Sequence, residues 1–239
     1  MPGPPAPIAS MNTQLLSTTV RRTLFLGWRY LAIGSVISVL LAFVLLFGPH
    51  GRSVFAQTYP LEIPIFAVTA SIGGLMTYAS DRTKGVFEYL IAYGVRPRSL
   101  FVNGLLSTAA LVGVFLALSL AILFGAALAA GVSLSETLLK NLALYSLPMS
   151  LAGALFTAIV GMIWASLSTP RAGMNSPVGL APMVGIAPTV FVLIAAEAAP
   201  PDEFYYVTVL SATVIGLAVI GLVAVSARLM GRERFLSPL

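Results

Sequence analysis

Side chains that could carry chemistry are few in this sequence. His50 is the one histidine and there is no cysteine, so we expect no zinc or haem site built from this chain alone. Asp202 and Glu203 are adjacent acids, for which we expect solvation in a loop. Lys84 and Lys140 are the two lysines, and neither belongs to a Gly-rich phosphate loop of the form G-x-x-x-x-G-K-[ST]. We therefore expect no catalytic residue, no cofactor and no metal on this chain.

The composition predicts an all-α integral membrane protein. The chain of 239 residues is 58% hydrophobic and 9% charged, with a mean hydropathy of +0.97, whereas soluble domains carry about 25% charged residues. Residues 1–10, rich in Pro, Ala and Gly, are expected to be disordered. Residues 11–239 are expected to form one transmembrane domain. Its stretches of roughly 20 apolar residues predict six spans, at about 28–47, 62–79, 100–126, 142–166, 178–196 and 205–227.

The basic residues predict an orientation for these spans. If the N-terminus is cytoplasmic, only Arg52 and Lys140 of the 13 basic residues fall on the outside. Loops that stay in the cytoplasm carry an excess of Lys and Arg. We therefore expect a multi-pass protein of the cytoplasmic (plasma) membrane with both termini in the cytoplasm.

Apart from Arg29 and Glu62, which lie at the edges of their spans, the spans within these boundaries contain no Asp, Glu, Lys, Arg or His. Ionisable groups inside the membrane are the usual components of proton relays and voltage sensors. Their absence argues against a proton-driven antiporter, although carbonyl and hydroxyl oxygens alone can bind sodium.

The fifth expected span differs from the others because prolines interrupt it, at Pro177, Pro182 and Pro188. Proline removes a backbone donor and kinks a helix. Such interruptions are tolerated in a membrane where neighbours or a cavity satisfy the freed carbonyls. This span is our candidate for lining a pathway or acting as a hinge, and a bent structural helix is the alternative.

Residues 12–27 precede the first span and have an amphipathic pattern. Leu16, Val20 and Leu24 recur every four residues, and Arg21 and Arg22 lie elsewhere on the helix. This pattern predicts a short helix in the cytoplasmic interface, with its arginines toward the lipid head groups. The alternative is that these residues extend the first span into water.

The segment 81–93 predicts a second short amphipathic helix, between the second and third spans. Its apolar side chains follow helical spacing, with the edge of Tyr93 beside them, and its charged side chains fall mainly on the other side. Gly94 is suited to end the helix, and Pro97 to open the third span. A helix this short is unstable alone, so its apolar face needs the head groups, the rest of the protein, or the groove of a partner. The apolar set is Val86, Phe87, Leu90 and Ile91, and the charged set is Asp81, Arg82, Lys84 and Glu88.

This order of elements resembles the permease subunits of ABC exporters of the second type. These have a cytoplasmic interfacial helix, six spans, and a coupling helix between the second and third spans. The local sequence DRTKGVFEYLIAYGVRPRSLFVNGLL, residues 81–106, is similar to theirs: charges of both signs, a glycine, a Glu in an apolar run, and a basic turn. Residues 197–204 are too short for the helical hairpin that many members carry before the sixth span.

The resemblance implies that 81–93 is a coupling helix that docks into a cleft of a separate ATPase subunit. Phe87, Leu90 and Ile91 would form the hydrophobic plug, with Arg82, Lys84 and Glu88 as polar contacts. ATP and Mg would bind to that partner, and a second permease copy or a paralogue would complete the complex. Transport would follow an alternating-access or lateral-gating mechanism, in the direction of export.

Two other functions are compatible with the sequence. The first is a secondary carrier or channel that works without ATP, and the second is a membrane scaffold that transports nothing. A carrier would transport in ATP-free liposomes under an ion gradient. A scaffold would co-purify with a larger assembly.

Overall fold

The computed structural model describes residues 8–48, 51–132, 135–168, 180–186, 190, 194 and 204–229. Within these ranges the chain is helical and contains no strand, which confirms the predicted all-α fold. The helices are α1 (Ile8–Phe47), α2 (Gly51–Thr83), α3 (Val86–Ala92), α4 (Pro97–Ala129), α5 (Glu136–Lys140), the π-helix η1 (Asn141–Ser146), α6 (Leu147–Leu167) and α8 (Phe204–Leu229).

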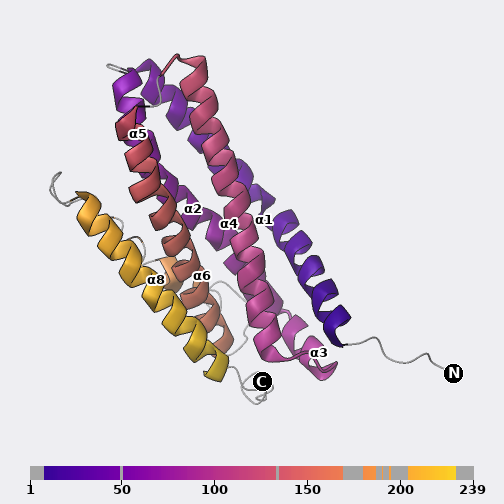
Figure 1. Ribbon diagram of the computed structural model, residues 1–239. Helices are drawn as coiled ribbons and strands as arrows, with labels where there is room; N and C mark the ends of the chain where they lie inside the picture. The colour runs from indigo at the N-terminus through magenta and orange to yellow at the C-terminus, as the bar shows by residue number, and fades with distance from the viewer. Residues whose placement is uncertain are drawn as a thin grey trace.

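The long helices run side by side along one axis, with α3 at one end of the bundle and α5 at the other (Figure 1). We call these the α3 end and the α5 end. The first turns of α1 lie at the α3 end (Figure 1). Helix α2 is central, because it packs against α1, α4 and α6.

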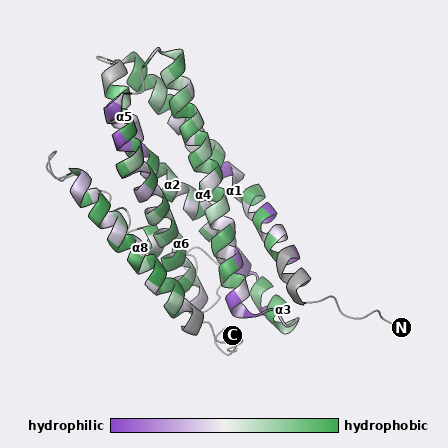
Figure 2. Cartoon of the chain, in the orientation of Figure 1, coloured by the Kyte–Doolittle hydropathy of each residue, from purple (hydrophilic) through white to green (hydrophobic). Residues whose placement is uncertain are grey.

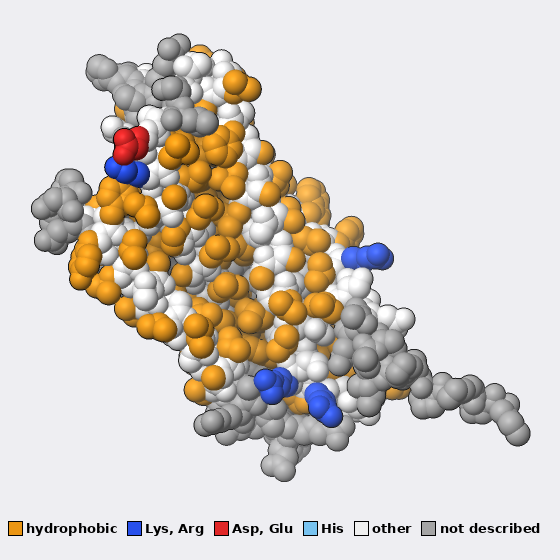
Figure 3. Space-filling model, in the orientation of Figure 1, with side chains coloured by type: hydrophobic (Ala, Val, Ile, Leu, Met, Phe, Trp, Pro, Cys, Tyr) orange, Lys and Arg blue, Asp and Glu red, His pale blue; other side chains and the backbone are white. Residues whose placement is uncertain are grey.

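Five described segments are long and apolar enough to cross a membrane: Gln14–Phe47, Val54–Thr83, Pro97–Ala129, Leu138–Leu167 and Phe204–Ser226. Hydrophobic residues occur along most of each long helix (Figure 2), and hydrophobic side chains are distributed along the whole length of the face drawn in Figure 3. The chain is therefore a multi-pass membrane protein by the length and composition of its helices. Most of the expected fifth span, 178–196, lies outside the described residues.

Helix α1 differs from the prediction at its N-terminal end. It begins at Ile8, so residues 8–10 are helical rather than disordered, and residues 1–7 lie outside the described part. The helix also continues through residues 12–27 without a break, so the interfacial helix is not a separate element. At 1.5 Å per residue its 40 residues span about 60 Å, roughly twice the hydrocarbon thickness of a bilayer. Residues 12–27 therefore extend the first membrane-spanning helix, as the alternative interpretation of the sequence had it.

Close packing between α2 and α4 depends on glycine. A Cβ placed on Gly74 would lie 2.2 Å from Oγ1 of Thr108. Only a residue without a side chain therefore allows these backbones to approach at this point, as small residues do in membrane helix pairs.

Two prolines lie inside α2, and a serine from a distant part of the chain compensates for one of them. Pro64 has no N–H to donate to the carbonyl of Pro60, four residues earlier. Ser146, at the end of η1, donates a hydrogen bond from its Oγ to this carbonyl. A freed carbonyl in the apolar bundle is thereby satisfied.

A second polar link lies near this serine, at the α5 end. Asn141 donates from Nδ2 to the carbonyl of Gln57 over 3.3 Å, and the hydroxyl of Tyr205 donates to Oδ1 of Asn141 over 2.7 Å. One side chain of η1 therefore connects α2 with α8.

We expect Ser146→Ala to lower the free energy of unfolding by about 1 kcal/mol, because the Pro60 carbonyl loses its partner. Pro64→Ala supplies the missing backbone N–H, so Ser146→Ala should cost much less in that background. Reversible unfolding of purified protein in mixed micelles measures both differences. Ser168→Ala, at an exposed serine, is the matched control. Equal costs in the two backgrounds would show that Ser146 does not act through this carbonyl.

Candidate functional site

Helix α3 is bounded by two glycines in left-handed conformations. Gly85 precedes it with φ 72°, and Gly94 follows it with φ 91°. The amides of Gly94 and Val95 donate to the carbonyls of Ile91 and Leu90, each over 3.0 Å. This is the Schellman arrangement, in which glycine is favoured because it has no Cβ. The prediction that Gly94 ends the helix is confirmed.

The start of the next helix also follows the sequence. Arg96 is extended, with φ −74° and ψ 133°, and Pro97 occupies the first turn of α4. A residue before proline is restricted to this extended region, and proline fits the first helical turn because its missing N–H has no partner there. The turn from α3 into α4 is therefore determined by local backbone chemistry.

The apolar face of α3 packs against the chain's own core. Phe87 and Ile91 are 4% and 0% exposed, and the ring of Phe87 meets that of Tyr78 edge to face with centroids 4.8 Å apart. The same cluster includes Leu100 of α4 and Met162 of α6. The side chains of Phe87 and Ile91 are therefore enclosed by their own chain and do not project as an external plug here, and docking of α3 into a partner stays a prediction. Leu90 and Val86 are half-buried.

Two ion pairs join the helices at the α3 end of the bundle. Asp81 and Arg82 belong to the last turns of α2 and are buried. Arg82 pairs with Glu88 of α3, and Arg22 of α1 pairs with Asp81 over 2.6 Å. These charges hold elements of the chain together, so Asp81 and Arg82 are already paired within the chain, and a contact of Arg82 with a partner stays a prediction. Asp81 and Arg82 lie in the last residues of the candidate span Val54–Thr83, beyond the boundary at residue 79 that the sequence predicted.

The opposite side of α3 is open, and we call it, together with the exposed residues that flank the helix, the tyrosine face. It consists of Lys84, Tyr89, Ala92, Tyr93 and Arg96, all exposed. Tyr89 and Tyr93 are 61% and 69% exposed, and their ring centroids lie 4.6 Å apart. A hydrogen bond with Tyr93 raises the pKa of Tyr89, which leaves this phenol neutral at physiological pH. Lys84 and Tyr93 were expected as contact residues, whereas Tyr89 was missed although its i, i+4 spacing from Tyr93 marks the same face.

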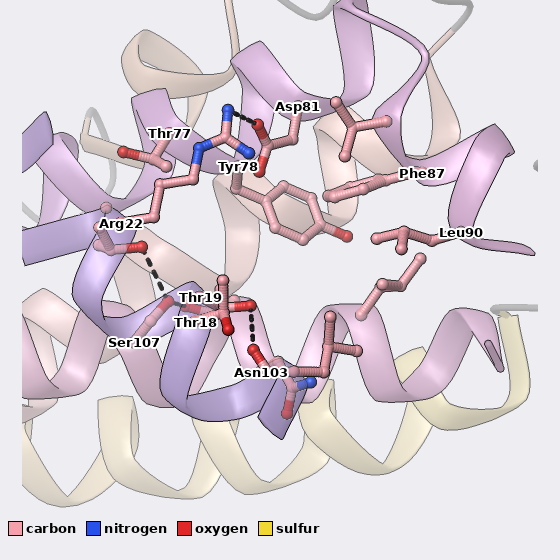
Figure 4. Close-up of a pocket in the computed structure, with 16 residues that line it drawn as sticks. Thr18, Thr19, Arg22, Thr77, Tyr78, Asp81, Phe87, Leu90, Asn103 and Ser107 are labelled. Carbon is pink, nitrogen blue, oxygen red and sulfur yellow. Dashed lines mark hydrogen bonds and ion pairs between the residues drawn. The ribbon is translucent and has the colours of Figure 1, made fainter. Parts of the chain in front are cut away.

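A cavity of about 210 Å³ lies among α1, α2, α3 and α4 (Figure 4). Its polar lining includes the Arg22–Asp81 pair, Asn103 of α4, and several hydroxyl groups. Asn103 is 8% exposed, and its Nδ2 has no hydrogen-bond partner. This residue was not predicted from the sequence, where its signal is a carboxamide within an otherwise apolar run.

The other predicted residues have simpler environments. Leu16, Val20 and Leu24 are half-buried along α1, and Arg21 is exposed. Pro182 lies in a described helical segment, 181–186. Pro177 and Pro188 lie outside the described residues, so a pathway or hinge in the fifth span stays a prediction.

Within the part of the chain that the structure describes, no group of three or more His, Cys, Asp or Glu side chains could hold a metal ion. In comparisons with protein-family models, curated proteins and solved structures, no match to the chain was found. Functional inference therefore depends on the α3 end itself.

Proposed function

We propose that this chain is the transmembrane permease subunit of an ATP-driven ABC transporter, with α3 as the coupling helix. One observation carries the proposal: α3 is fixed to the bundle on one face and open on the other. A helix of 7 residues between two long helices is too short to be stable alone. It keeps its shape here because its inner face is built into the core.

This arrangement would allow a mechanical displacement of α3 to be transmitted to the long helices. Phe87 and Ile91 join α3 to the cluster that includes residues of α4 and α6. The Arg82–Glu88 pair joins it to the end of α2. A displacement applied to α3 would therefore move the adjoining long helices with it, because packed interiors transmit strain.

The tyrosine face has the composition of a protein contact. Tyrosine and arginine are enriched at interfaces, where Tyr buries a large rigid surface and Arg donates several hydrogen bonds. We propose that an ABC ATPase subunit covers this face and that ATP, Mg and hydrolysis belong to that subunit. In this proposal the contact surface is formed by Tyr89 and Tyr93, with Lys84 and Arg96 beside them. These residues take the place of the hydrophobic plug that the resemblance to ABC exporters implied.

The proposal includes an orientation and a composition of the complex. The α3 end faces the cytoplasm, as the excess of Arg and Lys there indicates, and both termini are cytoplasmic in the plasma membrane. A second permease copy or a paralogue completes the translocation pathway, and transport is export. Lipid surrounds the exposed apolar faces of the long helices.

Site-specific photocrosslinking tests the proposal. A photoreactive phenylalanine analogue at Tyr89, in membranes of the native host, should crosslink to a protein that contains a phosphate-binding loop. The same analogue at Tyr206, an exposed tyrosine of α8, is the matched control. In addition, Tyr89→Asp should uncouple ATP hydrolysis from transport while the chain stays folded. If the position of Tyr89 crosslinks only to lipid, or transport persists without ATP under an ion gradient, the proposal is wrong and a secondary carrier is favoured.

A further inference from the structure

The cavity at the α3 end is lined by one ion pair and by uncharged polar groups. Its charged lining side chains are Arg22 and Asp81, which pair with each other. A ligand with a net charge would find no free counter-ion among the described lining residues. Burying an unpaired charge is costly, so the cavity favours an uncharged molecule.

The hydroxyl groups that line the cavity are already hydrogen-bonded. Thr19 and Thr77 donate to the carbonyls of Leu15 and Gly73, over 2.7 and 3.0 Å. Ser107 donates to Gly104, and Thr18, Thr23 and Tyr78 are also bonded. Asn103 is different, because its Nδ2 has no partner and the residue is more than nine-tenths buried. A buried donor without a partner carries a free-energy cost that an acceptor on a ligand would remove.

The rest of the lining is apolar. Leu15 of α1, Leu90 of α3 and Leu100 of α4 contribute to it, together with Val86 and Phe87. Figure 4 shows Thr18 and Thr19 of α1 near Asn103, with Phe87 and Leu90 on the side of α3. Water alone would satisfy the amide but not the apolar walls, whereas an alkyl or aromatic body would cover them.

We propose that this cavity binds an uncharged amphipath with a carbonyl head and a short apolar body. The carbonyl accepts a hydrogen bond from Nδ2 of Asn103, and the apolar body lies against the leucines. Such a molecule contacts both α1 and α3, so its binding restrains α3 relative to α1. This inference goes beyond the proposed transport function and does not require an ATPase partner. The carbonyl can come from the ester of a membrane lipid or from a free small molecule.

Single-cysteine labelling tests the site, because the natural sequence contains no cysteine. Thr19→Cys places a thiol in the cavity lining, and Ser17→Cys places one on the exposed side of the same helix turn. The full chain is reconstituted in nanodiscs of ether-linked lipid, which lacks carbonyls, and the rate of maleimide labelling is measured. The probe is octanamide, and octanoate and octylammonium are its charged counterparts.

Octanamide at about ten times its Kd should slow labelling of the Thr19→Cys variant about tenfold and leave the Ser17→Cys variant unchanged. Octanoate and octylammonium should protect far less. Asn103→Leu in the Thr19→Cys background should weaken protection by octanamide about tenfold, because the donor is lost. Asn103→Ala is the second variant if the larger side chain prevents folding.

Other outcomes overturn the inference. Equal slowing at both thiols would mean that octanamide acts only through the bilayer. Equal protection by all three probes would contradict the selection of an uncharged head, and protection that survives both substitutions of Asn103 would remove the assigned donor. No protection by any probe would leave water as the occupant. Nanodiscs of ester-linked lipid distinguish a lipid ester from a free small molecule as the source of the carbonyl. If the Thr19→Cys variant is labelled slowly in these nanodiscs without added octanamide, the lipid ester itself occupies the cavity.

Discussion

Phe87→Asp should unfold the α3 end of the bundle. The side chain of Phe87 is enclosed by Tyr78 and the surrounding core. The substitution removes the aromatic packing and places a carboxylate among apolar side chains. We expect the free energy of unfolding to fall by about 3–5 kcal/mol. Thermal unfolding of the purified protein, with size-exclusion chromatography to detect aggregation, measures the loss.

Tyr89→Asp is the matched control, two residues away on the open face. Because Tyr89 is exposed, this substitution should change stability by no more than about 0.5 kcal/mol. Comparing the two variants distinguishes an effect on folding from an effect on docking to the ATPase subunit. If Tyr89→Asp is as stable as the parent chain, a loss of ATPase coupling in that variant cannot be attributed to misfolding. If Phe87→Asp were as stable as the parent chain, the packing of α3 described here would be incorrect.

Arg82→Met should have the second largest effect. Arg82 is 2% exposed and pairs with Glu88, a half-buried acid of α3. Removing the guanidinium leaves a partly buried carboxylate without its counter-ion, and such a loss costs about 3 kcal/mol or more. Reversible unfolding in mixed micelles measures the change. Lys84→Met, two residues away at an exposed position, should be nearly neutral.

The double variant Arg82→Met with Glu88→Leu tests whether the ion pair itself is responsible. Removing both charges eliminates the uncompensated carboxylate, so the double variant should be more stable than Arg82→Met alone. Simple addition of the two single costs would mean that Arg82 and Glu88 stabilise the protein independently.

The sequence predicted the long helices well because a run of about 20 apolar residues, the length needed to cross a bilayer, is visible in the sequence alone. It also predicted the turn from α3 into α4, because Gly94 and Pro97 have backbone requirements of their own. It placed the end of α2 too early, since charged residues were taken to mark the edge of the span. Asp81 and Arg82 extend the helix instead, because Arg22 and Glu88 compensate for their burial.

The site was predicted only in part. An amphipathic stripe indicates that one face of a helix is covered, but not what covers it. Phe87 and Ile91 belong to that stripe, and their own chain covers them. Asn103 gave no periodic signal, and its missing partner became visible only when four helices were brought together. Long-range pairings of this kind depend on tertiary geometry, which local sequence patterns do not encode.

The hydrogen bond from Ser146 to the Pro60 carbonyl also has a consequence for biogenesis. The two residues are 86 positions apart. At about 5–20 residues per second, roughly 4–17 s of synthesis separate them. During that interval a nascent α2 in the hydrocarbon layer has a carbonyl without its final partner, which is unfavourable in lipid. The Pro60 carbonyl therefore acquires its final partner only after η1 has emerged, so α2 completes its polar pairing later than its own place in the chain suggests.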